Sequence, residues 1–530
     1  MRRASAYAGL LLLAACAQVR DPQGGPKDVA PPRLLGAEPA PGTTGFTAGR
    51  IVLHFDERIR LERPNERIII SPPLSPAPEY RVLGGSDIEV LFRSPLRANT
   101  TYSIALGEAV LDLSEGNPAG SLTYVFSTGT ALDSLRIHGV VRDAFTDAPV
   151  KDALVMLRTD TATDALRDSL PAYIARTDAN GRFALEHLAA GRYGIGALRD
   201  RNANFRYDLP DEELGFRSAG VRAGDSASVD LRLFREEPAA QTVMEAKVTA
   251  DRAWRMVLAR PGRSLRLRSI DRTGGVLTWA SEWSPGNDTV LLWPSDTTLL
   301  QDQRFAVYES DSLLDTLTYR TDKRMPFLLN ATPRKGRSGE NPVLRTSRPV
   351  ARLLRTTAAL ATAQGQERIA LNVDSTDRRT VHLAGVLPTE GPARLTLEPG
   401  TLEDIYGGRN DTLRLDLETL REGATGELRL SLQADTAGAP RGPLLLQLLN
   451  AQDERVLQLR VDQLPAHLAL GTLPTGTYRL RLVVDTDGNG RWSTGVLGAL
   501  RQPERVLRMA EAVNVRAGWE LDLTWVIGLN

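Results

Sequence analysis

Short runs in which apolar and polar residues alternate recur along the chain, separated by clusters of turn-forming residues. Residues 50–55 (RIVLHF) and 88–92 (IEVLF) are two clear examples. Because successive side chains of a strand point to opposite faces, such runs are typical of strands buried on one face. Their short, regular spacing predicts an all-β fold of tandem β-sandwiches. Residues 350–363, rich in Ala, Leu and Arg, are the clearest candidate for a helix.

Length and charge narrow the classes of function. The chain has 530 residues, enough for about three to five domains of ordinary size. Its 65 Lys and Arg residues equal its 65 Asp and Glu residues. Since no net field attracts the chain to a polyanion, we expect no nucleic-acid partner.

The N-terminus carries the most specific motif. Arg2 and Arg3 precede an apolar stretch, residues 6–13, which is far shorter than the roughly 20 residues of a membrane-spanning helix. The stretch ends in Leu13-Ala14-Ala15-Cys16, which resembles the bacterial lipobox. That resemblance implies a cleaved signal peptide (residues 1–15) and a covalent lipid on Cys16. An ordinary signal peptide followed by a chance cysteine is the alternative, but Cys16 is the only cysteine of the chain.

Residues 16–32 are polar and rich in Pro and Gly, which predicts a flexible tether after the lipid. Ala17 and Gln18 follow Cys16, without the Asp that retains lipoproteins in the inner membrane. We therefore expect a lipid-anchored protein of the outer membrane. Whether its domains face the periplasm or the cell surface stays open.

Two family resemblances cover the first half of the chain. Residues 55–57 (FDE), 96–104 (LRANTTYSI), 112–118 (DLSEGNP) and 126–129 (FSTG) resemble a bacterial Ig-like domain of the S-layer (SbsA) type, which we place at 33–130. Residues 137–141 (IHGVV), 149–155 (PVKDALV), 177–183 (TDANGRF) and 191–193 (GRY) resemble a carboxypeptidase-regulatory-like, or transthyretin-like, sandwich, placed at 131–238. Gly139 and Gly181 are expected at a bulge or a turn.

The chain also repeats itself. An ungapped offset of 285 aligns Leu188, Gly191, Tyr193, Asp200, Asn204 and Arg206 with Leu473, Gly476, Tyr478, Asp485, Asn489 and Arg491. This repeat predicts a second transthyretin-like sandwich at 422–530. Residues 402–408 (LEDIYGG) echo residues 110–116 (VLDLSEG) and indicate a second, degenerate Ig-like domain at 346–421. A β-rich segment, 239–345, joins the two pairs. The whole resembles a family of outer-membrane lipoproteins with Ig-like domains.

Two loops within the repeat are the candidate metal sites. Hard oxygen ligands at alternate positions can wrap around one Ca²⁺ ion. In the first loop Asp211 takes position 12, whereas the second loop has Val496 there and no closing carboxylate. The alternative is a plain turn, because Asp and Asn favour turns without any metal. The predicted ligands are Asp200, Asn202, Asn204, Asp208 and Asp211 with the Arg206 carbonyl, and Asp485, Asp487 and Asn489 with the Arg491 carbonyl.

Motifs for catalysis are absent from the sequence. The five histidines are scattered singly, and there is no His-Glu-x-x-His motif, no nucleophile elbow and no free cysteine. We therefore predict that the chain is not an enzyme. The resemblance to a carboxypeptidase accessory domain does not imply peptidase activity.

Two further patterns bear on glycans. Trp254, Trp279, Trp283 and Trp293 cluster in the middle segment and form either a sugar-stacking platform or a sandwich core. Tripeptides such as residues 133–135 (DSL) and 411–413 (DTL) resemble bacterial O-glycosylation sites, or are simply turns that lead into strands.

Three functions compete at this point. The first is a non-enzymatic scaffold that binds another envelope protein through lipidated sandwiches. The second is a carbohydrate-binding lipoprotein for polysaccharide capture. The third is a hydrolase whose site the motifs do not reveal.

Overall fold

The computed structural model describes residues 29–120, 122–160, 165–271, 278–284, 286–295, 302–320, 330–333, 343–384, 393–417, 425–435, 440 and 442–528. Cys16 and the predicted signal peptide lie outside these residues. Nearly all regular structure in the described part is β-strand, which confirms the all-β prediction. No helix among the described residues is long and apolar enough to cross a membrane.

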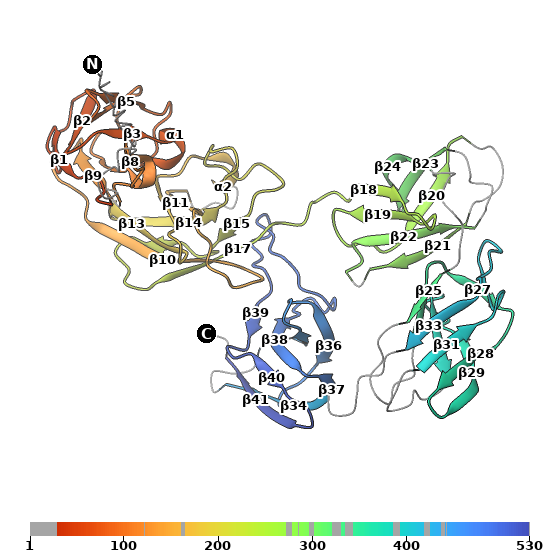
Figure 1. Ribbon diagram of the computed structural model, residues 1–530. Coiled ribbons are helices and arrows are strands. Elements are labelled where there is room, and N and C mark those ends of the chain that lie inside the picture. Colours follow the sequence, from red (N-terminus) through yellow and green to blue (C-terminus); the bar gives the residue numbers. More distant parts are fainter. Residues whose placement is uncertain are drawn as a thin grey trace, which may run out of the picture.

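The strands form five units in chain order (Figure 1), numbered here 1 to 5. Unit 1 is a sandwich of sheet β1-β2-β6-β5 on sheet β4-β7-β9, with a β3-β8 pair at one end. Tyr102 and Phe126 stack in its core with ring centroids 5.3 Å apart. Its elements are β1 (Leu34–Glu38), β2 (Arg50–Phe55), β3 (Ile59–Leu61), α1 (Pro64–Arg67), β4 (Ile69–Ser71), β5 (Glu79–Leu83), β6 (Asp87–Leu91), β7 (Thr101–Ala105), η1 (Gly107–Ala109), β8 (Val110–Asp112) and β9 (Thr123–Ser127).

Unit 2 packs sheet β13-β10-β17 on sheet β12-β11-β14-β15, with β16 paired to β14. Strand β11 is buried along its whole length, because the sandwich core covers one face and a second apolar cluster covers the other. The elements are β10 (Leu135–Asp143), β11 (Leu154–Arg158), α2 (Ala165–Asp168), β12 (Tyr173–Arg176), β13 (Arg182–Leu188), β14 (Arg192–Leu198), β15 (Leu214–Phe216), β16 (Val221–Arg222) and β17 (Val229–Leu233).

The two glycines singled out in unit 2 have different roles. Gly181 has φ +72° and forms a turn, as expected. Gly139 lies inside β10, between β13 and β17, and the register is regular there, so the alternative of a bulge is wrong for it. A Cβ at Gly139 would lie 2.0 Å from the Val229 carbonyl oxygen and 2.8 Å from the Phe183 ring. Close approach of its neighbours therefore requires glycine at this position.

Units 3 and 4 make up the middle of the chain. Unit 3 packs sheet β18-β19-β22-β21 near sheet β20-β23-β24, around one apolar core. Unit 4 has a seven-stranded sheet, β25-β26-β30-β29-β28-β31-β33, and a β27-β32 pair. Unit 3 consists of β18 (Val243–Val248), β19 (Trp254–Leu258), β20 (Leu265–Ser269), β21 (Trp279–Trp283), β22 (Thr289–Pro294), β23 (Gln303–Glu309) and β24 (Ser312–Tyr319). Unit 4 consists of β25 (Ala331–Pro333), β26 (Val343–Thr346), β27 (Val350–Leu353), β28 (Thr357–Thr362), β29 (Gly365–Val373), β30 (Thr380–Ala384), β31 (Ala393–Leu397), β32 (Leu402–Asp404) and β33 (Leu413–Leu417).

The helix expected at residues 350–363 is wrong, because this segment forms β27 and β28. Ala358 and Leu360, two residues apart, are both buried in the core of unit 4. A period of two is the period of a strand. Composition favoured a helix here, but packing against β29 and β31 determines the outcome.

Unit 5 repeats the topology of unit 2. It pairs sheet β37-β34-β41 with sheet β36-β35-β38-β39, and β40 pairs with β38 as β16 pairs with β14. In both units the first strand runs parallel to the last one, β10 with β17 and β34 with β41. The repeat predicted between these two parts of the chain is therefore present as a shared topology of units 2 and 5. The strands are β34 (Thr425–Ala434), β35 (Leu444–Leu449), β36 (Arg455–Val461), β37 (Ala466–Pro474), β38 (Gly476–Val484), β39 (Val506–Arg508), β40 (Val513–Val515) and β41 (Glu520–Ile527).

Side chains join the units to one another. The Ser71 hydroxyl of unit 1 accepts a hydrogen bond from the Ile174 backbone N–H of unit 2, at 3.1 Å. Glu282 of unit 3 forms ion pairs with Arg345 and Arg379 of unit 4. In Figure 1, a long loop of unit 5, drawn in blue, extends towards unit 2. Units far apart in the sequence therefore lie side by side.

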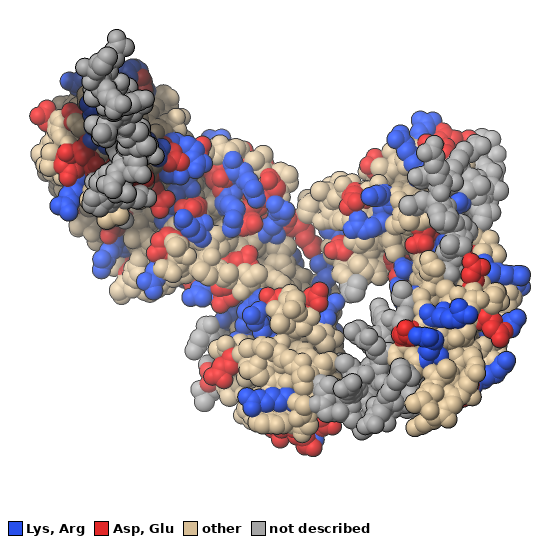
Figure 2. All heavy atoms as spheres, viewed as in Figure 1, with Lys and Arg blue, Asp and Glu red and all other residues tan. Residues whose placement is uncertain are grey.

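Opposite charges are mixed on the face of the molecule drawn in Figure 2. Figure 2 shows blue Lys and Arg side chains interspersed with red Asp and Glu side chains over the visible face of the units. This distribution agrees with the zero net charge of the chain. It offers no broad basic face on that side for a nucleic acid.

Candidate metal loops

The two predicted calcium loops follow equivalent strands. Loop A (residues 200–213) follows β14, and loop B (residues 485–504) follows β38. The first Asp of each loop is held by backbone N–H groups. Asp200 accepts from Asn204 and Phe205, at 3.3 and 2.8 Å. Asp485, which is fully buried, accepts from Asn489 and Gly490, both at 2.9 Å. The first residues of the two loops therefore have the same pattern of backbone hydrogen bonds.

A buried glutamate closes each loop, and neither one was among the predicted ligands. Glu212 accepts backbone hydrogen bonds from Arg201 and from Asp208, both at 3.1 Å. Glu504 accepts the equivalent bonds from Thr486 and from Ser493, at 2.5 and 2.8 Å. These donors hold positions 2 and 9 of their loops. Glu212 and Glu504 are therefore structural counterparts.

The sequence offset of 285 could not match these glutamates. Glu212 lies 12 residues after Asp200, whereas Glu504 lies 19 residues after Asp485. Extra residues in loop B, including Leu497 and Leu500, reach unit 2 and shift the register. A search for any glutamate downstream of each Asp-x-Asx-x-Asn motif would have found both.

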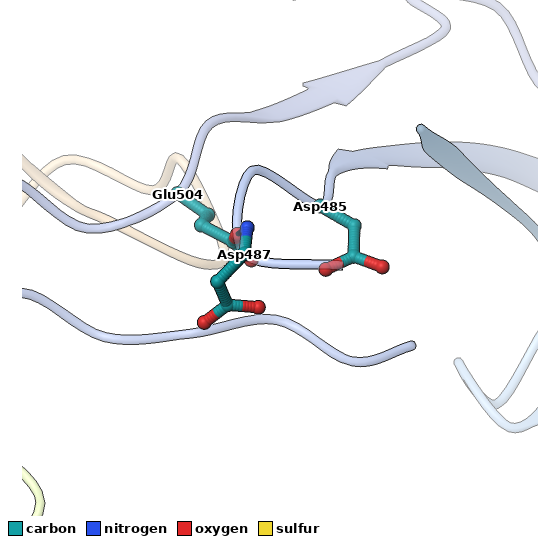
Figure 3. A group of neighbouring side chains, drawn as sticks. All are labelled: Asp485, Asp487 and Glu504. Carbon is teal, nitrogen blue, oxygen red and sulfur yellow. Dashed lines mark hydrogen bonds between the residues drawn. The ribbon is translucent and has the colours of Figure 1, made fainter. Parts of the chain in front are cut away.

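Loop B brings three carboxylates together (Figure 3). Ligand oxygens of Asp485, Asp487 and Glu504 all lie within 4.8 Å of one another. Asp485 and Glu504 are buried, and Asp487 is exposed. Each carboxylate oxygen has two lone pairs, so it can accept an N–H and still face a cation. Three hard oxygen donors of this kind suit Ca²⁺.

The remaining predicted ligands of loop B lie around this group. The Asn489 side chain donates to the Ser493 hydroxyl, which donates to Asp487, both at 2.7 Å. The Arg491 guanidinium forms an ion pair with Glu237 of unit 2, at 2.8 Å. Asn489 and Arg491 therefore support the loop and connect it to its neighbour.

Loop A does not gather three carboxylates as closely among the described residues. The Asn202 and Asn204 amides both donate to Asp208, at 3.2 and 2.7 Å. Asp211 points elsewhere, because its exposed carboxylate lies 3.6 Å from Arg201. Arg206 is exposed, and its backbone N–H donates to Asn204. The structure thus places Glu212, and not Asp211, at the closing position.

Loop B also forms much of the junction between units 2 and 5. The Trp492 ring packs edge-on against Phe145, with centroids 5.1 Å apart. The Thr494 hydroxyl donates to the Arg235 carbonyl at 2.6 Å, and the Leu497 N–H donates to Glu236 at 2.6 Å. The loop that holds the carboxylate group is therefore also a principal contact between unit 5 and unit 2.

The four tryptophans of unit 3 do not form an exposed platform. Trp254 and Trp293 are 1% and 2% exposed. Trp279 packs on Trp254, Phe305 and Tyr319 at centroid distances of 5.5–6.0 Å. Trp283 is partly buried against the same core. Of the two readings, the sandwich core describes these side chains.

The histidines His382 and His467 each contact a side chain that could take part in acid–base chemistry. His382 contacts Asp374, with 3.1 Å between Nε2 and Oδ2. His467 contacts Ser431 at 3.0 Å on the exposed face of the β37-β34-β41 sheet. Neither pair is joined by the further groups that a nucleophilic triad needs in the part of the chain that the structure describes.

Comparisons with known proteins support the domain class of unit 1. The family model described as bacterial Ig-like domain matches residues 28–128. No curated protein matches the chain.

Solved structures resemble the chain only weakly. The S-layer protein rSbsC(31-844) is 11% identical with a TM-score of 0.14, and the match covers 91% of this chain and 66% of that one. BcpA, the major pilin subunit of Bacillus cereus, is 9% identical with a TM-score of 0.15, covering 74% and 99%. Bacteroides ovatus SGBP-B, in complex with a mixed-linkage heptasaccharide, is 10% identical with a TM-score of 0.20, covering 71% and 93%. Likenesses of this size support no inference about function.

Proposed function

We propose that the chain is a non-enzymatic lipoprotein of the outer membrane, attached by a lipid on Cys16, whose β-sandwiches act as a scaffold for another envelope protein. The observation that carries this proposal is the junction of units 2 and 5, where loop B closes the chain back on itself through Trp492, Thr494 and Leu497. A closed arrangement fixes several sandwich surfaces relative to one another. A scaffold needs such fixed spacing, and a flexible string of domains would lack it.

Units 2 and 5 fit the carboxypeptidase-regulatory-like class as part of this proposal. Their shared topology, with the parallel pairs β10-β17 and β34-β41, supports that assignment. The resemblance implies a domain type that is not itself catalytic.

Carbohydrate capture is the weaker alternative. It rested on the tryptophans of unit 3, and those side chains are packed in a core or partly buried. Trp519 is a different case, since it is 55% exposed in unit 5. A single exposed ring does not make a platform for a glycan chain.

Ca²⁺ in loop B is a second proposal, concerned with the stability of the scaffold. Asp485, Asp487 and Glu504 would hold the ion, with hard oxygen ligands that fit its chemistry. A bound ion would stiffen the loop that attaches unit 5 to unit 2. Loop A is the weaker candidate, because its carboxylates are farther apart.

Capture of the partner tests the scaffold. The full chain with a C-terminal tag is cross-linked in intact envelopes and purified in mild detergent. We expect at least one envelope protein that an untagged control lacks. Trp492→Ala should reduce its recovery while leaving the chain in the membrane fraction. Cys16→Ala should release the chain from that fraction. Recovery of no specific partner would contradict the scaffold, and an unaltered membrane fraction for Cys16→Ala would contradict the anchor.

A further inference from the structure

Arg158 is a buried cation at the end of β11. It is 3% exposed. One terminal nitrogen donates to the Phe205 carbonyl at 2.9 Å and the other donates to the Ser169 hydroxyl at 3.2 Å. Its Nε is buried and has no hydrogen-bond partner. The partners of the guanidinium are thus neutral, and its Nε–H donor is unpaired.

No counter-charge balances this group within the described residues. No ion pair involves Arg158 there, whereas Arg348, the other buried arginine of the described residues, is paired with Asp404. Burial, followed by the nearby Arg206, lowers the pKa of Arg158 to about 10. Both influences oppose the charged form. Placing an unbalanced guanidinium in the protein interior is costly.

The repeat shows that the fold does not need a charge here. Arg158 lies opposite Gly194 in the β11-β14 pair, and Leu449 lies opposite Arg479 in the β35-β38 pair. Gly194 and Arg479 are related by the offset of 285. Leu449 is therefore the counterpart of Arg158, and it is fully buried. An apolar side chain fills the same place in unit 5.

Arg158 also holds loop A, and this contact does not require a positive charge. The Phe205 carbonyl that Arg158 holds corresponds to the Gly490 carbonyl of loop B. In unit 5 the neutral amide of Gln458 donates to Gly490, at 3.2 Å. A neutral amide in unit 5 thus donates the hydrogen bond that the Arg158 guanidinium donates in unit 2. The positive charge calls for a separate explanation.

Arg158 lines a small cavity at the junction of units 2 and 5. The cavity measures about 50 Å³ and is also lined by Arg217, Ser218 and Gly196 of unit 2 and by Leu497 and Leu500 of unit 5. A single water needs about 10–15 Å³ on this measure, so several waters or one small anion would fit. Two guanidinium groups and a hydroxyl are the donors that oxyanions prefer. Asp160 also lines the cavity, and its side chain is exposed.

We propose that this cavity binds a small tetrahedral oxyanion, phosphate or sulfate, as the counter-ion of Arg158. Arg217 and Ser218 contribute further donors from the end of β15. Leu497 and Leu500 cover the anion from unit 5, so binding also favours the docked arrangement of the two units. The site is independent of the metal proposal, because it uses none of the carboxylates of loop B.

Thermal unfolding of the full chain in mild detergent tests the site. The midpoint is measured in EDTA-treated protein at rising phosphate or sulfate and compared with chloride at equal ionic strength. We expect the wild type to gain about 2 °C or more over chloride at saturating anion, because the ligand binds only the folded state. Arg158→Met should abolish this gain. It should still fold, since Leu449 occupies the equivalent position.

Arg167→Met is the matched control, because Arg167 also belongs to unit 2 but is paired with Glu236, which accepts a hydrogen bond from Leu497 of unit 5. It should keep the gain. Acetate is included as a carboxylate, and we expect a smaller gain from it than from phosphate. Sulfate also stabilises proteins without binding, so an equal gain in the wild type and in Arg158→Met would overturn the proposal. No gain over chloride in the wild type would overturn it as well, and so would a gain from acetate that matches phosphate.

Discussion

The Trp492 ring of loop B packs edge-on against the Phe145 ring of unit 2, and its indole N–H donates to the Glu504 carbonyl at 2.9 Å. One side chain thus contacts both the neighbouring unit and the carboxylate loop. The Arg481 guanidinium covers the Phe145 ring at 4.5 Å. Aromatic pairs and cation–π contacts of this kind stabilise beyond the area they bury.

Trp492→Ala should weaken the junction. We expect a loss of about 1–3 kcal/mol in the free energy of unfolding of unit 5, since the ring is partly buried and one hydrogen bond is lost. Urea unfolding followed by tryptophan fluorescence measures it. Trp519→Ala is the control, because Trp519 is 55% exposed, and its cost should be about 1 kcal/mol or less. Equal losses in the two variants would contradict a special role for Trp492.

Calcium should raise the unfolding temperature of the chain. At a concentration about 100 times the dissociation constant, a ligand specific to the folded state adds about 2.7 kcal/mol. Asp485→Asn should remove the increment, because it neutralises the buried carboxylate of the group. Asp200→Asn changes the equivalent residue of loop A and should keep most of it. Calorimetry with Ca²⁺ and with EDTA measures both, and no shift at millimolar Ca²⁺ in the wild type would rule the site out.

The Arg348–Asp404 pair should be sensitive to loss of either partner. Arg348 and Asp404 are 0% and 1% exposed, and they form an ion pair within unit 4. Asp404→Asn leaves the guanidinium without its closest anion, and we expect a loss of about 3–5 kcal/mol. Arg352→Ala breaks the neighbouring pair with Glu403, in which Arg352 is 63% exposed, and should cost far less, because solvent screens an exposed ion pair. Chemical unfolding of unit 4 compares the two, and similar losses would refute the difference.

Acid should weaken unit 4 through Asp374. The Thr376 hydroxyl, followed by His382 and the backbone N–H groups of Thr376 and Asp377, holds the pKa of Asp374 well below its ordinary value of 3.8. Because the folded state favours the carboxylate, the stabilisation is present above about pH 4 and is lost as pH falls towards the folded pKa. Asp374→Asn should therefore flatten the decline of the unfolding midpoint below about pH 4. A decline as steep as in the wild type would contradict the assignment.

Much of the fold follows from local patterns. Alternating runs such as residues 50–55 became strands because one face meets a core, and the repeat of Asp200 and Asp485 predicted that units 2 and 5 share a fold. The pattern failed at residues 350–363, where helix-favouring composition is overruled by pairing with β29 and β31. The boundaries of the domains stay predictions, and β25 and β26, placed in the middle segment, pair within the sheet of unit 4.

The candidate site was only partly predictable. Asp485 and Asp487 lie in one motif, so their proximity follows from local spacing. Glu504 follows an insertion in loop B, and the sequence does not predict the length of that insertion. The backbone N–H groups that hydrogen-bond to the Glu504 carboxylate come together only in the folded loop. The role of loop B at the junction depends on Phe145, about 350 residues away in the chain. No local pattern contains that information.

The distance between units 2 and 5 tests the closed scaffold most directly. Spin labels are placed on cysteines that replace the exposed residues Glu186 of β13 and Asp522 of β41, in a Cys16→Ser background, and the distance distribution is measured by double electron–electron resonance. The closed junction predicts one narrow distribution in the full chain, which broadens in Trp492→Ala. A broad distribution in the chain with an intact loop B, as for two domains on a flexible linker, would contradict it.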